Sequence, residues 1–128
     1  MQGAKDVFLH YKGLNKNLDI YCVPGAFEIP GTIQQILYHK KSHAIVALGS
    51  VIRGETPHFD FVAGESAHGI SQISRNTDIP IINGILTTDN LDQAMARSEP
   101  GNGQNKGWEA MEAALHMISV YRQIQISK

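Results

Sequence analysis

Residues 44–52 form an almost unbroken run of small and β-branched apolar side chains. Such a run is typical of a central strand in a parallel sheet, because helices cover both faces of that strand. The run ends at a glycine turn, Gly54, and a helix start follows, with Thr56 as a favourable N-cap and Pro57 as the first helical residue. The pattern therefore predicts a strand that leads through a turn directly into a helix over residues 57–75.

Further apolar runs and apolar residues at helical spacing predict the other elements. They are strands over residues 18–23 and 79–86, helices over residues 3–12, 27–41 and 108–124, and a short helix capped by residues 87–89 that ends at Arg97. Strands that alternate with helices predict a parallel α/β sheet flanked by helices. A helix over residues 3–12 normally crosses over from an earlier strand, so we expect a first strand that is missing from these 128 residues.

Composition narrows the class of protein. The 128 residues, 42% of them hydrophobic and 18% charged, are typical of one globular domain over 1–128. A formal net charge of −1 gives no electrostatic argument for binding nucleic acid or a membrane. No apolar run approaches the roughly 20 residues of a membrane span. The single cysteine, Cys22, has no disulfide partner and no metal-ligand pattern around it, so we expect a reducing, cytoplasmic compartment and no metal.

The turn after residues 44–52 is a candidate reaction centre. Backbone N–H groups and the positive end of a helix dipole point there to the carboxyl edge of the sheet, which makes an anion site. His58 lies in the first turn of the same helix, where a neutral imidazole can transfer protons near neutral pH. A histidine that pairs with a local carboxylate is the alternative that the residues alone leave open.

The chain resembles the lumazine synthase family in four segments: VPGAFEIP at residues 23–30, LGSVIRGETPHFDFVAGE at 48–65, GILTTDNLDQAMAR at 84–97 and NKGWEA at 105–110. The resemblance implies a three-layer, flavodoxin-like fold around a four-stranded parallel sheet. It implies an enzyme that joins 5-amino-6-(D-ribitylamino)uracil to 3,4-dihydroxy-2-butanone 4-phosphate, without a metal or organic cofactor. It also implies a homopentamer or an assembly of pentamers, with active sites between subunits, and makes riboflavin synthase a candidate partner.

The resemblance assigns roles to individual residues. His58 matches the proton-transfer histidine of the family. The residues that match the ribitylaminouracil site are Ala26, Phe27, Glu28, Ser50, Val51, Ile52 and Asn83. The residues that match the butanone phosphate site are Gly54, Glu55, Thr56 and Arg97, with Lys106 as a further candidate.

Some of these positions have ordinary alternatives or depart from the family. The alternative for Glu28 is a first-turn glutamate that the helix dipole stabilises. The alternative for Arg97 is a solvated cation at a helix end, and that for Lys106 is a surface lysine. Asn83 stands where relatives place a phenylalanine over the substrate ring of a neighbouring subunit, so weaker pyrimidine binding is expected. The loop over residues 98–104 is one residue longer than usual, which favours a pentamer or a pentamer pair over a hollow shell. If the first strand is absent, a catalytically impaired assembly or a flavin- or pyrimidine-binding scaffold is the alternative function.

Overall fold

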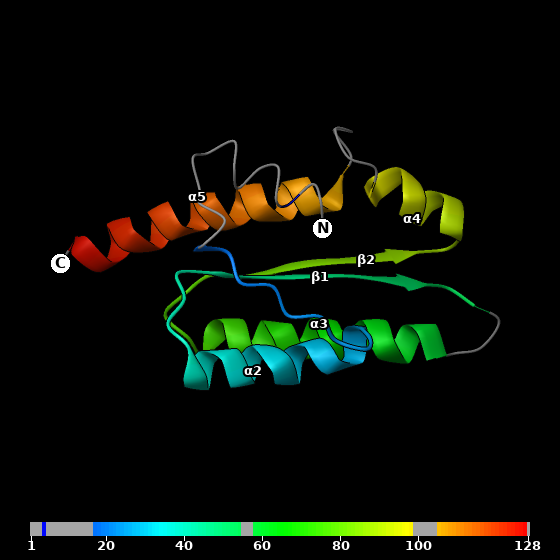
Figure 1. The fold of residues 1–128 in the computed structure, drawn as a ribbon, viewed down its shortest axis with the longest axis horizontal. Helices are drawn as coiled ribbons and strands as arrows, with labels where there is room; N and C mark the ends of the chain where they lie inside the picture. Colours follow the sequence, from blue (N-terminus) through cyan, green and yellow to red (C-terminus); the bar gives the residue numbers. More distant parts are fainter. Residues whose placement is uncertain (1–3, 5–16, 55–57, 99–104, 128) are drawn as a thin grey trace.

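The computed structural model describes residue 4 and residues 17–54, 58–98 and 105–127. In chain order the elements are η2 (Ala26–Glu28), α2 (Ile29–His39), β1 (Ile45–Ile52), α3 (His58–Arg75), β2 (Ile81–Thr88), α4 (Leu91–Ser98) and α5 (Lys106–Ile126). The two strands form the middle layer, with α2 and α3 on one face and α4 and α5 on the other (Figure 1). The predicted α/β class, with a parallel sheet flanked by helices, is confirmed.

The two strands are parallel and in register, from Ile45 opposite Ile81 to Ile52 opposite Thr88. β1 begins one residue later than the predicted run and ends where that run ends. The chain returns from the end of β1 to the start of β2 through α3, which is the crossover that a parallel pair requires. The sequence pattern therefore located the central strand and the helix that follows it.

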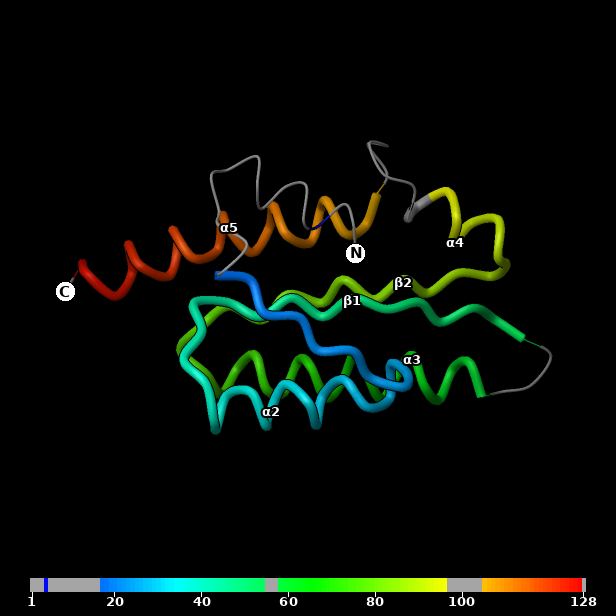
Figure 2. The backbone as a smooth tube through the Cα atoms, viewed as in Figure 1, coloured from blue at the N-terminus to red at the C-terminus, as the bar shows by residue number. Residues whose placement is uncertain are grey.

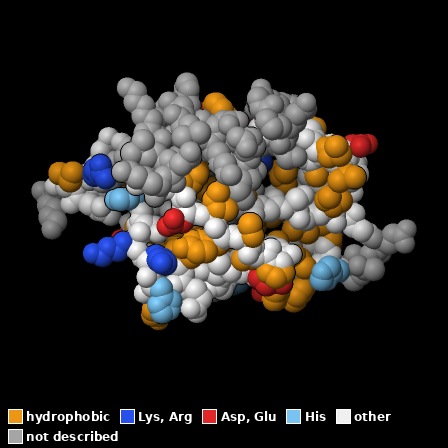
Figure 3. All heavy atoms as spheres, viewed as in Figure 1, with side chains coloured by type: hydrophobic (Ala, Val, Ile, Leu, Met, Phe, Trp, Pro, Cys, Tyr) orange, Lys and Arg blue, Asp and Glu red, His pale blue; other side chains and the backbone are white. Residues whose placement is uncertain are grey.

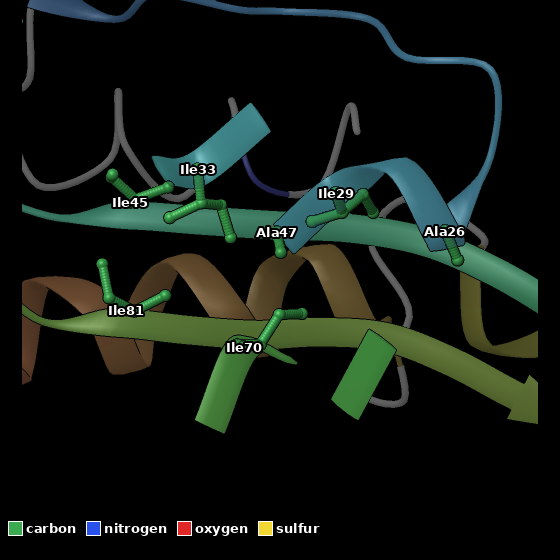
Figure 4. Close-up of a cluster of buried hydrophobic side chains, with 7 residues drawn as sticks. All are labelled: Ala26, Ile29, Ile33, Ile45, Ala47, Ile70 and Ile81. Atoms are coloured by element: carbon green, nitrogen blue, oxygen red, sulfur yellow. The ribbon is translucent and has the colours of Figure 1, made fainter. Parts of the chain in front are cut away.

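The core has one part on each face of the sheet. The part against α2 and α3 contains seven buried residues (Figure 4): Ala26, Ile29, Ile33, Ile45, Ala47, Ile70 and Ile81. On the opposite face, Met111 of α5 packs with Val46 and Leu48. Successive side chains of a strand point to opposite faces, so β1 alternately supplies residues to each part of the core.

Two glycines allow the layers to approach closely. A Cβ atom at Gly84 would lie 2.8 Å from the carbonyl oxygen of Ala47 and 2.9 Å from the Cβ of Ala110. A Cβ atom at Gly69 would lie 2.8 Å from the Cβ of Pro30. The contacts of β2 with α5, and of α3 with α2, therefore have no room for a side chain at these positions.

The predicted strand over residues 18–23 is wrong. The segment has no regular secondary structure, and the sheet of the described residues contains only β1 and β2. Figure 2 shows that the segment runs in the same direction as β1. A cavity separates the two, lined by residues 17–21 on one side and 44–48 on the other. A strand needs a hydrogen-bonded neighbour, and the place beside this segment is hollow.

Helices α4 and α5 both begin at an asparagine cap. The N–H of Gln93 donates to Oδ1 of Asn90 at 2.9 Å, and the N–H of Trp108 donates to Oδ1 of Asn105 at 2.8 Å. The predicted cap of the short helix, residues 87–89, is therefore wrong. The first two of these residues belong to β2, which ends two residues later than predicted.

Several predictions fall largely outside the described residues. Of the predicted helix over residues 3–12, only Ala4 is described. The predicted cap at Thr56 lies outside the described residues, and of the loop over residues 98–104 only the first residue is described. Within the described ranges, every helix is too short or too polar to span a bilayer.

Candidate functional site

The carboxyl end of β1 opens into a hollow of about 260 Å³. Its lining residues come from η2, the end of β1, the turn after it and the start of α3, and they are Ala26, Ser50, Val51, Ile52, Gly54, His58, Phe59 and Val62. Six of these eight are predicted site residues. The fold therefore brings the predicted proton-transfer residue together with the predicted strand end and turn.

The hydrogen bonding at the end of the sheet produces this arrangement. The N–H of Arg53 donates to the carbonyl oxygen of Thr88 at 2.8 Å, so pairing with β2 continues one residue beyond β1. The chain then leaves the sheet at Gly54, and α3 begins at His58. Val62 lies one helical turn after His58 and shares its face, so both side chains line the hollow.

The strand end offers backbone groups as well as side chains. The hydrogen bond from the N–H of Arg53 to Thr88 shows that this N–H points toward β2. Along a strand, the backbone groups of successive residues point to opposite sides, so Ser50 and Ile52 direct their N–H and C=O groups away from β2. These groups can donate and accept hydrogen bonds beside the hollow, which is what a pyrimidine ring requires.

His58 is exposed at the mouth of the hollow. The carboxylate that follows it most closely in the sequence, Asp60, pairs with Arg53 instead, at 3.6 Å between Oδ1 and Nη1. That pairing weakens the alternative in which His58 serves only a local carboxylate. No cluster of three or more His, Cys, Asp or Glu side chains suited to a metal ion occurs among the residues that the structure describes.

Arg53 is not among the predicted site residues, yet it connects the elements of the site. Its Nε lies 3.0 Å from Oδ1 of Asp89, and its Cζ lies 4.5 Å from the ring centre of Phe59. Together with Asp60, these contacts join the ends of both strands to the first turn of α3. The sequence offered one signal, because parallel strands end at the same edge of a sheet and Asp89 lies three residues after the predicted strand over residues 79–86.

The aromatic and acidic residues predicted for the pyrimidine site lie beside the hollow rather than in its wall. Phe27 is about half exposed, and its ring stacks on Phe61 of α3 at 5.8 Å between centroids. Glu28 is exposed, and its carbonyl oxygen accepts a bond from the Thr32 hydroxyl at 2.8 Å. Both residues adjoin Ala26, which does line the hollow. The structure therefore leaves the dipole-stabilised alternative for Glu28 open.

Asn83 lies apart from the hollow of its own chain. It pairs in register with Ala47, whereas Ser50 pairs with Leu86, so Asn83 is three residues, about 10 Å, back along the sheet. Its Oδ1 accepts the N–H of Ile85 at 3.0 Å. That N–H points away from β1, so Asn83 satisfies a backbone donor at the outer edge of β2.

The predicted phosphate residues are only partly described. Gly54 lines the hollow, while Glu55, Thr56 and the side chain of Arg97 lie outside the described part of the structure. Helix α4, which contains Arg97, and the first residue of α5, Lys106, lie toward the carboxyl end of the sheet (Figure 1). They are on the face opposite α3. A complete phosphate site is therefore not assembled from the described residues.

A parallel α/β sheet with a hollow at the carboxyl end of a strand, next to a helix start, defines a class of proteins that bind small molecules at this edge. Comparison with known proteins gives the family within this class. Residues 1–122 match the family described as 6,7-dimethyl-8-ribityllumazine synthase. The chain belongs to this family, as its four resembling segments predict.

Curated relatives carry the same name. The 6,7-dimethyl-8-ribityllumazine synthase of Campylobacter jejuni subsp. jejuni serotype O:23/36 (strain 81-176) is 44% identical over 124 residues, which are 97% of this chain and 80% of the relative. The enzyme of that name from Nautilia profundicola has the same identity and coverage. That of Campylobacter hominis is 43% identical over 125 residues, 98% of this chain and 80% of the relative.

Proposed function

We propose that the chain condenses 5-amino-6-(D-ribitylamino)uracil with 3,4-dihydroxy-2-butanone 4-phosphate. The products are 6,7-dimethyl-8-ribityllumazine, phosphate and water, in the penultimate step of riboflavin biosynthesis. Family membership and the names of the relatives support this transferase activity. The structural observation that carries the proposal is the hollow in which His58 adjoins Gly54 and the end of β1.

The chemistry needs little more than this arrangement. An amine must add to a ketone, a proton must be moved so that phosphate can leave, and a ring must close. Two bound substrates held side by side and one group that exchanges protons near neutral pH satisfy these demands. His58 supplies the proton-exchanging group in this proposal, and its exposure at the mouth of the hollow leaves the imidazole accessible to substrate.

In this proposal the ribitylaminouracil occupies the β1 side of the hollow. The N–H and C=O groups of Ser50 and Ile52, which point away from β2, hydrogen-bond the pyrimidine, and Val51 and Ala26 contact its ring. Glu28 accepts hydrogen bonds from the ribityl hydroxyls, and Phe27 adjoins them. Ala26, Ser50, Val51 and Ile52 line the opening, and Phe27 and Glu28 directly follow Ala26, which supports the assignment.

The butanone phosphate occupies the turn side. The backbone of Gly54, Glu55 and Thr56 donates to the phosphate, as expected where a helix begins. Arg97 supplies the cation, because its planar guanidinium suits phosphate oxygens. Lys106 is a further cation near the phosphate or at a subunit interface, and the location of α4 and the start of α5 toward the carboxyl end of the sheet supports both assignments (Figure 1).

We further propose a homopentamer, or a pair of pentamers, with each site completed by a neighbouring subunit. Asn83 lies too far back along the sheet to reach the hollow of its own chain, so it would serve a neighbour. Leu91 and Met95 of α4 and Phe61 of α3 are each more than half exposed. Figure 3 shows hydrophobic side chains gathered at the end that carries α4. Exposed apolar patches of this kind are typical of protein interfaces.

Three further expectations belong to this proposal. Riboflavin synthase, which uses the lumazine product, is a candidate partner, and a reducing cytoplasm agrees with the exposed thiol of Cys22. A catalytically impaired scaffold is the alternative function. Family membership favours the enzyme, and an assay separates the two.

The test is to mix both substrates with the purified chain and to follow lumazine absorbance and phosphate release. The proposal expects turnover, reduced roughly 10²- to 10⁴-fold by His58→Ala as the proton-transfer group is lost. His68→Ala, in the same helix but outside the hollow, is the matched control and should keep full activity. Pyrimidine or flavin binding without any phosphate release would favour the scaffold.

A further inference from the structure

Two phenylalanine rings stack beside the hollow at His58. Phe27 belongs to η2 and Phe61 to the first turn of α3, and their ring centroids lie 5.8 Å apart with 20° between the ring planes. This separation is within the range of favourable aromatic pairs. Phe27 is a predicted residue of the ribitylaminouracil site, whereas Phe61 is outside that set.

The aromatic pair lies where η2 and α3 both meet the hollow. Ala26 directly precedes Phe27, and Val62 directly follows Phe61, and both of these neighbours line the hollow. His58, which also lines it, comes three residues before Phe61, so the two side chains leave the helix about 60° apart. The two rings therefore adjoin the residues that enclose the hollow without forming its wall.

The turn that carries Phe27 gives its side chain little support. η2 is a single 3-10 turn, Ala26–Glu28, and no side chain caps its start at Gly25. The N–H of Glu28 closes the turn by donating to the carbonyl oxygen of Gly25 at 3.2 Å, a long hydrogen bond. Phe27 is also 52% exposed. Exposed side chains change rotamer rapidly, so the stack on Phe61 is what restrains this ring.

Helix α3 is the firmer of the two partners. It has 18 residues, and at Gly69 it approaches Pro30 so closely that an added Cβ atom would lie 2.8 Å from the proline ring. Pro30 follows η2 in the first turn of α2. Gly69 follows Phe61 by eight residues, or roughly 12 Å along the helix. The segment with Phe27 is therefore held against α3 at two separate points.

We propose that Phe61 is a positioning residue of the ribitylaminouracil site. Its ring holds the ring of Phe27 in the orientation that the ribityl chain meets. The inference rests on the proposed function and adds to it a residue that the resemblance does not assign. Without Phe61, substrate binding itself has to immobilise the side chain of Phe27, and this loss of freedom weakens the affinity. Phe61 therefore acts on pyrimidine binding and not on the butanone phosphate or on proton transfer.

The experiment measures the Kd of ribitylaminouracil by titration calorimetry. Phe61→Leu keeps an apolar side chain but removes the ring, so we expect Kd to rise roughly 3- to 10-fold. Phe61→Tyr keeps the ring and should leave Kd unchanged. Tyr38→Leu removes an aromatic residue that is 77% exposed in α2 and outside the hollow, so it is the matched control and should also leave Kd unchanged.

A double-mutant cycle tests whether Phe61 acts through Phe27. Phe61→Leu should raise Kd in the unaltered chain but not in a chain that already carries Phe27→Leu, because no ring is left there to be positioned. Steady-state kinetics gives a second readout. For Phe61→Leu, KM for the pyrimidine should rise, while kcat and KM for the butanone phosphate stay the same. A general structural defect would change all three quantities.

Several outcomes would overturn the proposal. An unchanged Kd for Phe61→Leu excludes a role in binding, and an equal rise of Kd with and without Phe27→Leu shows that Phe61 acts independently of Phe27. Sedimentation is measured on the same samples. If Phe61→Leu breaks up an oligomer and Kd recovers at protein concentrations that restore it, the ring is an interface contact and the proposal fails.

A failure of the proposed function is seen separately. If the unaltered chain binds ribitylaminouracil but releases no phosphate with both substrates present, the synthase activity is excluded. The comparison of Kd values then still decides the role of Phe61. If the unaltered chain does not bind the pyrimidine at all, both proposals are overturned.

Discussion

Nε of Arg53 lies 3.0 Å from Oδ1 of Asp89, which links the residue after β1 to the residue after β2. The same guanidinium contacts Asp60 at 3.6 Å and lies over the ring of Phe59 at 4.5 Å. These two residues directly follow His58 in the first turn of α3. Two carboxylates already balance the charge of Arg53, so we expect it to position the helix start rather than to bind phosphate.

Arg53→Lys should therefore lower turnover more than it lowers stability. A lysine keeps the charge but loses the planar fork that reaches both carboxylates. Small displacements of a catalytic group are costly, so we expect kcat to fall by roughly tenfold. The side chains of Arg53, Asp60 and Asp89 are about half exposed or more, so the free energy of unfolding should change by only about 0–1 kcal/mol. Steady-state kinetics and thermal unfolding measure the two effects.

Arg75→Lys, at the other end of α3, is the matched control for that substitution and should change neither quantity. A different pattern would contradict the positioning role. If Arg53→Lys raised KM for the butanone phosphate and left kcat unchanged, the arginine would be a direct phosphate ligand.

Arg97→Ala should weaken the butanone phosphate and spare the pyrimidine. A hydrogen bond to a charged group contributes about 1.5–3 kcal/mol, so KM for the phosphate substrate should rise roughly 10- to 100-fold. Arg75→Ala provides the comparison, because it removes a cation from the last turn of a helix that starts at the hollow. Equal KM values for Arg97→Ala and the unaltered enzyme would mean that Arg97 is only a solvated helix-end cation.

Two glycines of α3 should respond in opposite directions to alanine. Gly64 has no neighbouring atom within 4 Å of an added Cβ, so Gly64→Ala should raise the free energy of unfolding by about 0.5–1 kcal/mol through helix propensity. Gly69→Ala would place its Cβ 2.8 Å from the rigid ring of Pro30, so it should lower that free energy by about 1–3 kcal/mol. Chemical denaturation measures both, and stabilisation by Gly69→Ala would contradict the close contact of α2 and α3.

Asn83→Phe should lower the free energy of unfolding and raise the affinity for the pyrimidine. The substitution removes the acceptor for the N–H of Ile85, which is worth about 0.5–1.5 kcal/mol. Stacking of an aromatic ring on a base contributes about 1–3 kcal/mol, so KM for ribitylaminouracil should fall if this residue reaches a neighbouring site. Asn83→Leu removes the same hydrogen bond without adding a ring and serves as the control. A KM that is equal in the two variants would place Asn83 away from the substrate.

Local patterns predicted most of the elements. The apolar run at 44–52, the glycine turn after it and the periodic stripe of the following helix are properties of neighbouring residues. They located β1 and α3 to within about a residue, and they placed His58 beside Gly54 at a strand end. In the structure, residues of this neighbourhood line one hollow. The four family segments in the sequence likewise identified the family.

Pairing between distant segments could not be predicted in this way. Residues 18–23 have the composition of a strand, but a strand exists only when another backbone bonds to it, and the sequence does not state which neighbour is present. The roles of Arg53 and Asn83 depend likewise on partners across the sheet.

The sequence by itself determined the order of β1, α3, β2 and the helices that follow, the position of His58 at a helix start and the family, because these depend on short-range spacing and composition. Only the tertiary structure decided that Arg53 joins two strand ends to a helix start, and that a cavity separates residues 17–21 from the start of β1. Both depend on hydrogen bonds and packing between residues that are far apart in the chain.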